Sequence, residues 1–315
     1  MHQNLVSFVA VLILVIVVAL VVIHQLVSTA GEKMDQVVDK VQGYIDDIVH
    51  PGIVPFTDIT YPTDIPSTIE ELYGTDNGVV TCAATIQSAV NSYFDKNLFL
   101  PKEFNVRGRL ADYGLVLEHD NYVIVTFRGS ANSKDYARDF QAFQETFLDV
   151  NGLSYKGMCH VGFKNIVLGL SGLLSQFLHG VNKPMIFVGH SLGGCLAILS
   201  AMYFAPILPE QRYLITFAAP RFGDLDFNEA MYKVMNNRRQ IASMSDFIPQ
   251  FPLSVFGGYY NYLFGKGMEL IDFQTGGLIN NHSLLGYRAT YEGTCQKGGT
   301  SPYNNMKWCM KSLAL

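Results

Sequence analysis

A glycine-flanked serine between a strand-like run and a helix-like run constrains this chain more than any other feature. The motif is GHSLGG, at residues 189–194, with Ser191 at its centre. The apolar residues 185–188 before it predict a short buried strand, and the residues from Leu192 to about Phe204 predict a helix. Glycines two positions before and two after the serine let the strand and the helix meet at a sharp turn. Such a turn exposes the serine hydroxyl beside the backbone N–H of Leu192, which indicates a nucleophile.

Further strand-like and helix-like segments alternate along the body of the chain. Apolar runs at residues 114–118 and 122–127 predict two strands joined by a tight turn. Residues 213–217 and 239–243 predict more strands, and residues 79–94 and 226–235 predict helices. This alternation is typical of a central, mostly parallel sheet with helices on both faces. The fold class that we predict is therefore α/β.

A serine nucleophile needs a base and an acid partner, and the chain offers few of them. In proteins built on this turn, the order along the chain is serine, then Asp or Glu, then His. His282 is the one histidine after Ser191, so it is the candidate base. Four aspartates lie between the two, and we select Asp246 because it follows a predicted strand. Those at positions 224 and 226 begin a predicted helix, where aspartate serves as an N-cap, and position 272 is expected in a loop.

Six motifs occur in an order that resembles one protein family. They are FRGS at 127–130, HVGF at 160–163, GHSLGG at 189–194, TFAAPRFGD at 216–224, DFIP at 246–249 and HSLLGY at 282–287. The set resembles the class 3 lipases, the fungal triacylglycerol lipase type of α/β-hydrolase, over roughly residues 79–291. The resemblance implies an α/β-hydrolase fold. One departure is Ala218, where the family usually has glycine, and we expect it to affect packing behind the site rather than the chemistry.

The resemblance also implies roles for individual residues. It assigns Ser191, Asp246 and His282 as a catalytic triad, in agreement with the selection above. It makes Ser130 the first oxyanion-hole residue and the backbone N–H of Leu192 the second.

The family also carries a mobile lid in the segment that here lies between FRGS and HVGF. Aromatic residues recur in it at steps of four, three and four, at Tyr136, Phe140, Phe143 and Phe147. This spacing predicts a helix whose apolar face covers the acyl groove in water and turns toward lipid at an interface. An aromatic stripe at helical spacing is equally typical of a buried core face, so that alternative stays open.

The N-terminal residues have the character of a membrane segment. Leu5 to Ile23 is apolar apart from Ser7, and a helix of this length spans about 28 Å, close to the thickness of a bilayer core. No Lys or Arg precedes it, which favours a retained single-pass transmembrane anchor. Cleavage of a signal after Ala30, giving a secreted protein, is the alternative. We divide the chain into residues 1–30 (anchor or signal), 31–66 (stalk helix and proline-rich linker) and 67–315 (lipase-like domain).

Two features bear on the side of the membrane where the body lies. Two lysines follow the apolar segment, which leans toward a cytoplasmic body. The tail that holds the last two cysteines has no regular period and favours a disulfide, which needs an oxidising compartment. We expect a lumenal or extracellular body, with the third cysteine buried in the core. The five cysteines are Cys82, Cys159, Cys195, Cys295 and Cys309.

Composition and motifs exclude several classes of function. Apolar residues make up 49% of the chain and charged residues 16%, which indicates a packed body rather than disorder. The net charge of −5 lacks the basic footprint of a nucleic-acid binder. There is no phosphate loop, dinucleotide fingerprint or zinc-like spacing, so we expect neither cofactor nor metal.

The resulting prediction is a membrane-anchored serine esterase that hydrolyses acylglycerols through an acyl-enzyme. Its partner would be a lipid ester at a membrane or emulsion interface. Phospholipase A1 and feruloyl-type esterase activities are alternatives within the same chemistry. An inactive lipase-like protein that binds lipid or a partner is an alternative of another class, and the complete triad argues against it.

Overall fold

The computed structural model describes residues 105–129, 143–252, 268–274 and 308–313, and six positions between 281 and 290. Several predictions lie outside these residues. They concern the anchor Leu5–Ile23, the stalk and linker, the helix at 79–94, Ser130, Tyr136, Phe140, Cys82 and Cys295.

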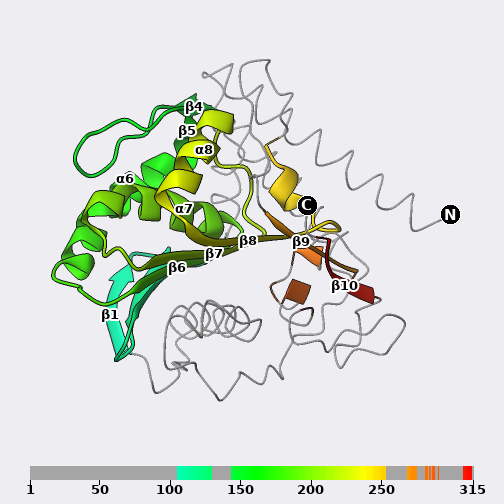
Figure 1. Cartoon of the computed structure of the whole chain (residues 1–315), viewed down its shortest axis with the longest axis horizontal. Coiled ribbons are helices and arrows are strands. Elements are labelled where there is room, and N and C mark those ends of the chain that lie inside the picture. Colours follow the sequence, from blue (N-terminus) through cyan, green and yellow to red (C-terminus); the bar gives the residue numbers. More distant parts are fainter. Residues whose placement is uncertain are drawn as a thin grey trace, which may run out of the picture.

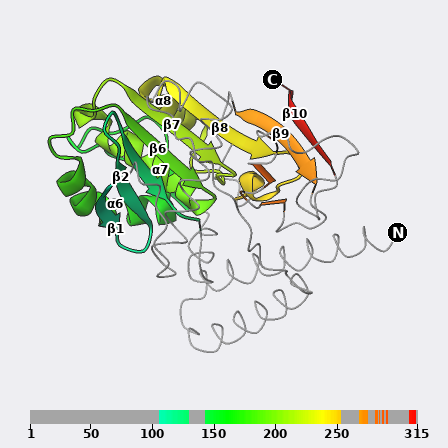
Figure 2. The same cartoon turned by 90° about the horizontal axis from the view of Figure 1, so that it is seen from below.

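An eight-stranded sheet organises the described residues (Figure 1). In spatial order its strands are β1 (Asn105–Leu110), β2 (Gly114–Glu118), β3 (Val123–Phe127), β6 (Met185–His190), β7 (Arg212–Phe217), β8 (Asn237–Ser243), β9 (Glu269–Gln274) and β10 (Trp308–Leu313). Neighbouring strands from β3 to β9 are parallel, whereas the pairs β1–β2, β2–β3 and β9–β10 are antiparallel. Figure 2 shows the parallel strands β6, β7 and β8 side by side in the middle of the sheet. The sheet is therefore mixed, with the predicted parallel part at its centre.

Three long helices lie on one face of this sheet. They are α6 (Val161–Leu178), α7 (Leu192–Phe204) and α8 (Leu225–Val234). Helix α7 crosses the centre of the sheet and contacts α6 and α8 on its two sides (Figure 1). The opposite face is buried as well, since Ile124, Ile186 and Ile215 are inaccessible there. Strands covered on both faces are apolar without alternation, as these are.

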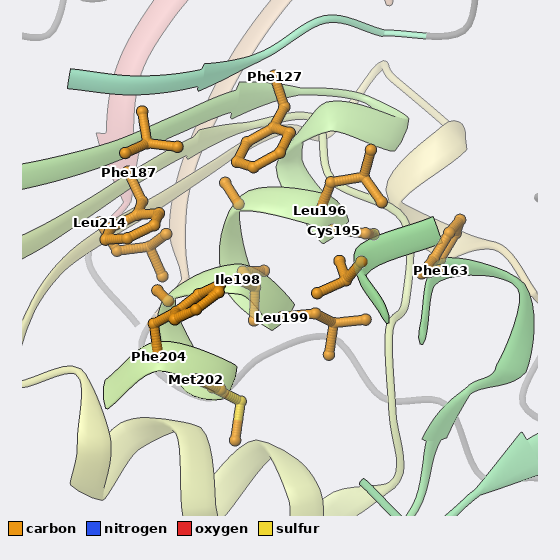
Figure 3. Packing of buried hydrophobic residues seen from close by; sticks show 14 of the residues in the cluster. Phe127, Phe163, Phe187, Cys195, Leu196, Ile198, Leu199, Met202, Phe204 and Leu214 are labelled. Atoms are coloured by element: carbon orange, nitrogen blue, oxygen red, sulfur yellow. The ribbon is translucent and has the colours of Figure 1, made fainter. Parts of the chain in front are cut away.

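Helix α7 is buried on every side. Its only incompletely buried residue is Tyr203, consistent with a helix that is apolar all round. Figure 3 shows Phe127 of β3, Phe187 of β6 and Leu214 of β7 around Leu196 and Ile198 of α7. Since protein interiors are close-packed, this core fixes the N-terminus of α7 against the strand that precedes it.

A short second sheet and two short helices complete the described elements. Strands β4 (Gln144–Glu145) and β5 (Cys159–His160) pair antiparallel just before α6. The 3₁₀ helices η1 (Ala205–Ile207) and η2 (Ile248–Gln250) follow α7 and the loop after β8. The His160 imidazole caps α6, because its Nδ1 accepts the N–H groups of Gly162 and Phe163.

Helix α6 is, among the described residues, the one helix long and apolar enough to cross a membrane. Its residues Phe163, Val167 and Leu174 are completely buried, and the helix packs on α7. We therefore assign α6 to the core. Sequence reasoning missed it because exposed Leu168 and Leu173 interrupt the polar stripe that marks a surface helix.

Apart from the predicted lid helix, the strands and helices predicted between residues 114 and 243 are confirmed, with ends that shift by two residues at most. Two predictions from the C-terminal part are wrong. Asp272, expected in a loop, lies on β9, and Cys309, expected in an irregular tail, lies on β10. Polar residues interrupt the apolar residues of both strands, whose sequences are ELIDFQ and WCMKSL, which leaves a weak pattern in the sequence.

Candidate active site

The turn between β6 and α7 holds Ser191 in a backbone conformation that non-glycine residues rarely adopt. Its φ is 57° and its ψ is −130°. The Ser191 N–H donates to the carbonyl of Phe217, at the end of β7, at 2.9 Å. A Cβ atom on Gly189 would collide with the backbone of Gly193, so only glycine lets β6 and α7 meet this closely. The turn places the serine hydroxyl at the carboxyl edge of the parallel strands.

His282 lies between Ser191 and Asp246. Its Nε2 is 2.7 Å from Ser191 Oγ, and its Nδ1 is 2.8 Å from Asp246 Oδ2. An ionised carboxylate only accepts hydrogen bonds, so Nδ1 carries the ring proton. Nε2 is then the acceptor for the serine O–H. The structure thus brings together the three residues selected from the sequence, which come from three different loops.

The Asp246 carboxylate is completely buried and has three donors. His282 Nδ1–H and the Tyr287 O–H, at 2.8 Å, both donate to Oδ2, and the Ile248 N–H donates to Oδ1 at 3.0 Å. The Tyr287 oxygen in turn accepts the N–H of Ser243, the last residue of β8, at 3.0 Å. These bonds compensate the cost of burying a charge. Sequence reasoning missed Tyr287, although it closes the HSLLGY motif.

Two hydrogen bonds hold the loop that carries His282. The side-chain amide of Asn281, 3% exposed, donates to the carbonyl of Ser245 at 3.1 Å. The imidazole of His190 donates from Nε2 to the carbonyl of His282 at 2.8 Å. Burial, and after it the electrostatic effect of His282, lowers the pKa of His190 to about 3, so this ring is neutral at physiological pH. The loop of His282 is therefore tied to the loop of Asp246 and to the turn of Ser191.

The predicted oxyanion-hole residues are placed in part. Leu192 is the first residue of α7, and the N–H groups of a helix's first turn have no acceptor within the helix. Ser130 lies outside the described residues, but Gly129 before it lies beside the nucleophile: a Cβ atom there would be 3.4 Å from Ser191 Cβ. The Arg128 guanidinium anchors this segment by donating to the carbonyls of Gly129, at 2.9 Å, and Asp112.

The predicted lid helix is wrong over its described part. Residues 144–145 form strand β4 instead of helix, and Gln144 between the two aromatic positions is buried. Phe147 is completely buried and packs edge-on against Phe227 of α8, with ring centroids 5.9 Å apart, so it is a core residue and not part of a lid. Phe143 is 45% exposed, so its burial does not contradict its predicted place in a lid.

The two cysteines whose side chains are described are buried thiols. Cys195 lies in α7, as expected of a core residue, and its Sγ donates to the carbonyl of Pro220 at 3.3 Å. Burial raises the pKa of the Cys159 thiol to about 12. Both are poor nucleophiles in these surroundings.

Comparison with known families assigns the region around the site. Residues 124–256 match the family described as lipase (class 3), and this range includes Ser191 and Asp246. Residues 124–256 of this chain belong to the class 3 lipase family. The chain is accordingly a carboxylic ester hydrolase of the lipase type. His282, which completes the hydrogen-bonded set, lies beyond the matched class 3 lipase range.

Solved structures similar to this chain are fungal lipases. The lipase–propeptide complex of Rhizomucor miehei is 19% identical, covers 70% of this chain and 78% of its own, and has a TM-score of 0.48. The lipase of Rhizopus microsporus var. chinensis is 18% identical, with coverages of 70% and 83% and a TM-score of 0.47. The triacylglycerol lipase of Penicillium expansum is 16% identical, with coverages of 64% and 82% and a TM-score of 0.45. At TM-scores this low, the family assignment rests on the family match alone.

A search of curated protein sequences finds no significant match to the chain.

Proposed function

We propose that this class 3 lipase hydrolyses lipid esters through a covalent acyl-enzyme, with Ser191 as nucleophile, His282 as base and Asp246 as the carboxylate that orients the base. The observation that carries the proposal is the continuous hydrogen-bonded chain from Ser191 Oγ through the His282 imidazole to Asp246. Nδ1 of His282 donates to Asp246, so Nε2 is the nitrogen that can accept the serine proton.

In the first half-reaction, Ser191 Oγ attacks the ester carbonyl carbon while its proton passes to His282 Nε2. The carbonyl oxygen becomes an oxyanion, which the Leu192 N–H and Ser130 stabilise by donating hydrogen bonds. Collapse of the tetrahedral intermediate breaks the ester bond, and His282 gives its proton to the departing alcohol. The buried Asp246 stays ionised and stabilises the imidazolium that forms in between.

In the second half-reaction, water enters in place of the alcohol and loses a proton to His282 Nε2 as it attacks the acyl carbon. Collapse of the second intermediate returns the proton to Ser191 Oγ and releases a fatty acid. The proton balance closes within the Ser191–His282 pair, so this chemistry calls for no cofactor.

The substrate class that we propose is triacylglycerol at a membrane or emulsion interface. The family match of residues 124–256 supports a lipid ester, and exposed Phe143, which lies in the predicted lid segment, supports contact with an apolar surface. We also propose that Leu5–Ile23 holds the enzyme at a membrane as a single-pass anchor, with a lumenal or extracellular body. Cleavage after Ala30 would give a secreted enzyme. Phospholipase A1 and feruloyl-type esterase activities are the competing outcomes of a substrate panel.

The test combines a nucleophile variant with a matched serine control. Ser191→Ala should lower kcat by about three orders of magnitude or more and abolish labelling by a fluorophosphonate probe. Ser200→Ala, in the middle of α7, removes a buried hydroxyl that has no hydrogen-bond partner and should keep both properties. Labelling that persists in Ser191→Ala would overturn the assignment.

The same proteins are then assayed on emulsified triacylglycerol, phospholipid vesicles and a soluble short nitrophenyl ester. Triacylglycerol hydrolysis with weak action on the other two supports the proposed substrate. Activity on none of the three would favour the alternative of an inactive lipid- or partner-binding protein.

A further inference from the structure

His190 is the residue immediately before the proposed nucleophile, and its side chain contacts the proposed base. The two imidazole rings of His190 and His282 have centroids 4.8 Å apart with planes inclined by 34°. The rings of His190 and Tyr287 are also arranged edge to face, at a centroid distance of 6.5 Å and an angle of 70°. The proposed mechanism gives His190 no chemical step, so its position calls for another explanation.

The protonation of His190 follows from its acceptor. Its Nε2 lies 2.8 Å from the carbonyl oxygen of His282, and a carbonyl only accepts, so Nε2 carries the hydrogen. With a lowered pKa, the ring holds no second proton, and Nδ1 keeps its lone pair. His190 is thus a neutral donor aimed at the main chain of the base.

The other side of the His190 ring faces the segment that leads to Ser130. A Cβ atom on Gly129 would lie 3.4 Å from His190 Nδ1 and equally close to the His190 carbonyl oxygen. The ring therefore fills the space between Gly129 and the loop of His282. A larger or smaller side chain would change the separation of these two segments.

We propose that His190 is a positioning residue that fixes the main chain of His282 relative to the neighbouring Ser191. The inference rests on the proposed function. Consecutive residues hold the base at two points: Ser191 at the imidazole Nε2 and His190 at the main-chain carbonyl. The contacts with Ser191 and Asp246 hold the two ring nitrogens of His282, and the bond from His190 holds the main chain from which the ring extends. Together they set the direction of the Nε2 lone pair. Proton transfer depends on this direction, because a displacement of about 1 Å costs on the order of 100-fold in rate.

The neutral state of the His190 ring also suits this positioning role. His282 becomes positively charged in each transition state, and a second positive charge at 4.8 Å would oppose that change. A lysine or arginine in this position could reach the carbonyl of His282 as a donor but would bring that charge. A neutral imidazole donates without it.

The test uses three replacements of His190 that differ in their donor. Gln has an amide N–H at nearly the reach of Nε2, Asn has one that is a bond shorter, and Phe keeps a ring without a donor. Each variant is assayed in the full chain with a soluble short nitrophenyl ester, which separates kcat from effects at a lipid interface. The rate of fluorophosphonate labelling and the melting temperature are measured on the same preparations.

We expect His190→Phe to lower kcat and the labelling rate by about 10- to 100-fold, with KM within about threefold of the wild type. His190→Gln should keep kcat within about fivefold, and His190→Asn should lose nearly as much as Phe. The control is His119→Gln. His119 lies in the turn between β2 and β3, next to the amino end of β3 and not at the carboxyl ends of the parallel strands where Ser191 lies, so this variant should leave kcat unchanged. If His190→Phe fails to fold, the contrast between Gln and Asn carries the test.

The inference is overturned if His190→Phe keeps kcat within twofold, if Gln and Asn lose equally, or if the loss appears in KM. Failure of the proposed function looks different, because Ser191→Ala would then retain activity. A Ser191→Ala variant that is inactive beside a His190→Phe variant that is fully active would remove the positioning role and leave the triad intact.

Discussion

Replacing Tyr287 with phenylalanine removes one oxygen that makes two buried hydrogen bonds. The hydroxyl donates to Asp246 Oδ2 at 2.8 Å and accepts the N–H of Ser243 at 3.0 Å. Tyr287 and Asp246 are both completely buried, so water has no direct access to either vacated partner. The ring would stay in place, since it packs edge-on against Phe217 and Phe273 at centroid distances of 6.0 and 5.0 Å. The substitution therefore isolates the hydroxyl.

The size of the effect follows from these two bonds. A hydrogen bond to a charged acceptor contributes about 1.5–3 kcal/mol, and a buried N–H without an acceptor costs about 1–3 kcal/mol. Partial relaxation reduces the sum, so we expect Tyr287→Phe to lower the free energy of unfolding by about 3 kcal/mol. Asp246 keeps its bonds from His282 and Ile248, and the orientation of the base is weakened but not lost. We expect kcat to fall by about tenfold, equivalent to about 1.4 kcal/mol.

Tyr232→Phe is the matched control. The Tyr232 hydroxyl is buried and has no hydrogen-bond partner, and its ring lies under the Arg238 guanidinium at 4.0 Å, a contact that phenylalanine keeps. Its removal should change stability by less than about 0.5 kcal/mol. Both variants are unfolded in urea under circular dichroism, and kcat is measured on a soluble ester. If Tyr287→Phe cost no more than Tyr232→Phe, the hydroxyl would not bridge Ser243 and Asp246 in solution.

Three further predictions concern acid, the lid segment and glycosylation. The pKa of His190 lies below its ordinary value of 6.5, at about 3, so the unfolded chain binds a proton that the folded chain does not. This contribution to stability is complete above pH 6.5 and is lost as the pH falls toward 3, by about 2–3 kcal/mol at pH 4 after allowance for the partial exposure of the His190 side chain. Urea unfolding of wild type and His190→Gln at pH 7 and pH 4 should show the smaller acid loss in the variant, and equal losses would contradict the prediction. Phe147→Ser should destabilise the protein by about 3–5 kcal/mol and reduce hydrolysis of emulsified and soluble esters alike. Phe143→Ser should leave stability within about 0.5 kcal/mol and depress mainly emulsion hydrolysis, and an equal effect of the two variants on stability would refute the distinction. Asn281 lies in a sequon, but its buried amide already bonds to the main chain, so it should be unglycosylated in active enzyme; a glycosidase-sensitive mobility shift that disappears in Asn281→Gln would show otherwise.

The centre of the fold was predictable because its signals are local. Residues 185–188 are a continuous apolar run, the motif that follows has glycines at the spacing of a tight turn, and α7 is apolar throughout. These properties specify strand, turn and helix without reference to the rest of the chain. The base could be selected by elimination, since one histidine follows the nucleophile. The bonds that join it to Ser191 and Asp246 required the structure.

The errors arise where a local pattern has two physical readings. Phe143 and Phe147 have the spacing of adjacent turns of a helix, yet the residues between them pair with β5, and only Phe147 reaches the core. Tyr287 is 41 positions from Asp246, and its hydroxyl finds the carboxylate only after the sheet and the C-terminal segment have packed. Contacts between residues so distant in sequence leave no periodic trace, which is why the support of the acid was missed.

Ser191 and His282 are 91 positions apart in the sequence, which has a consequence during protein synthesis. A ribosome delivers the nucleophile's strand, turn and helix, and then Asp246, well before it delivers His282 and Tyr287. Until His282 leaves the ribosome, the nascent chain has Ser191 without its proposed base, and under the proposed mechanism it cannot hydrolyse lipid esters. A premature stop anywhere between Asp246 and His282 leaves a chain without its proposed base. Hydrolytic competence is thus among the last properties that the growing chain acquires.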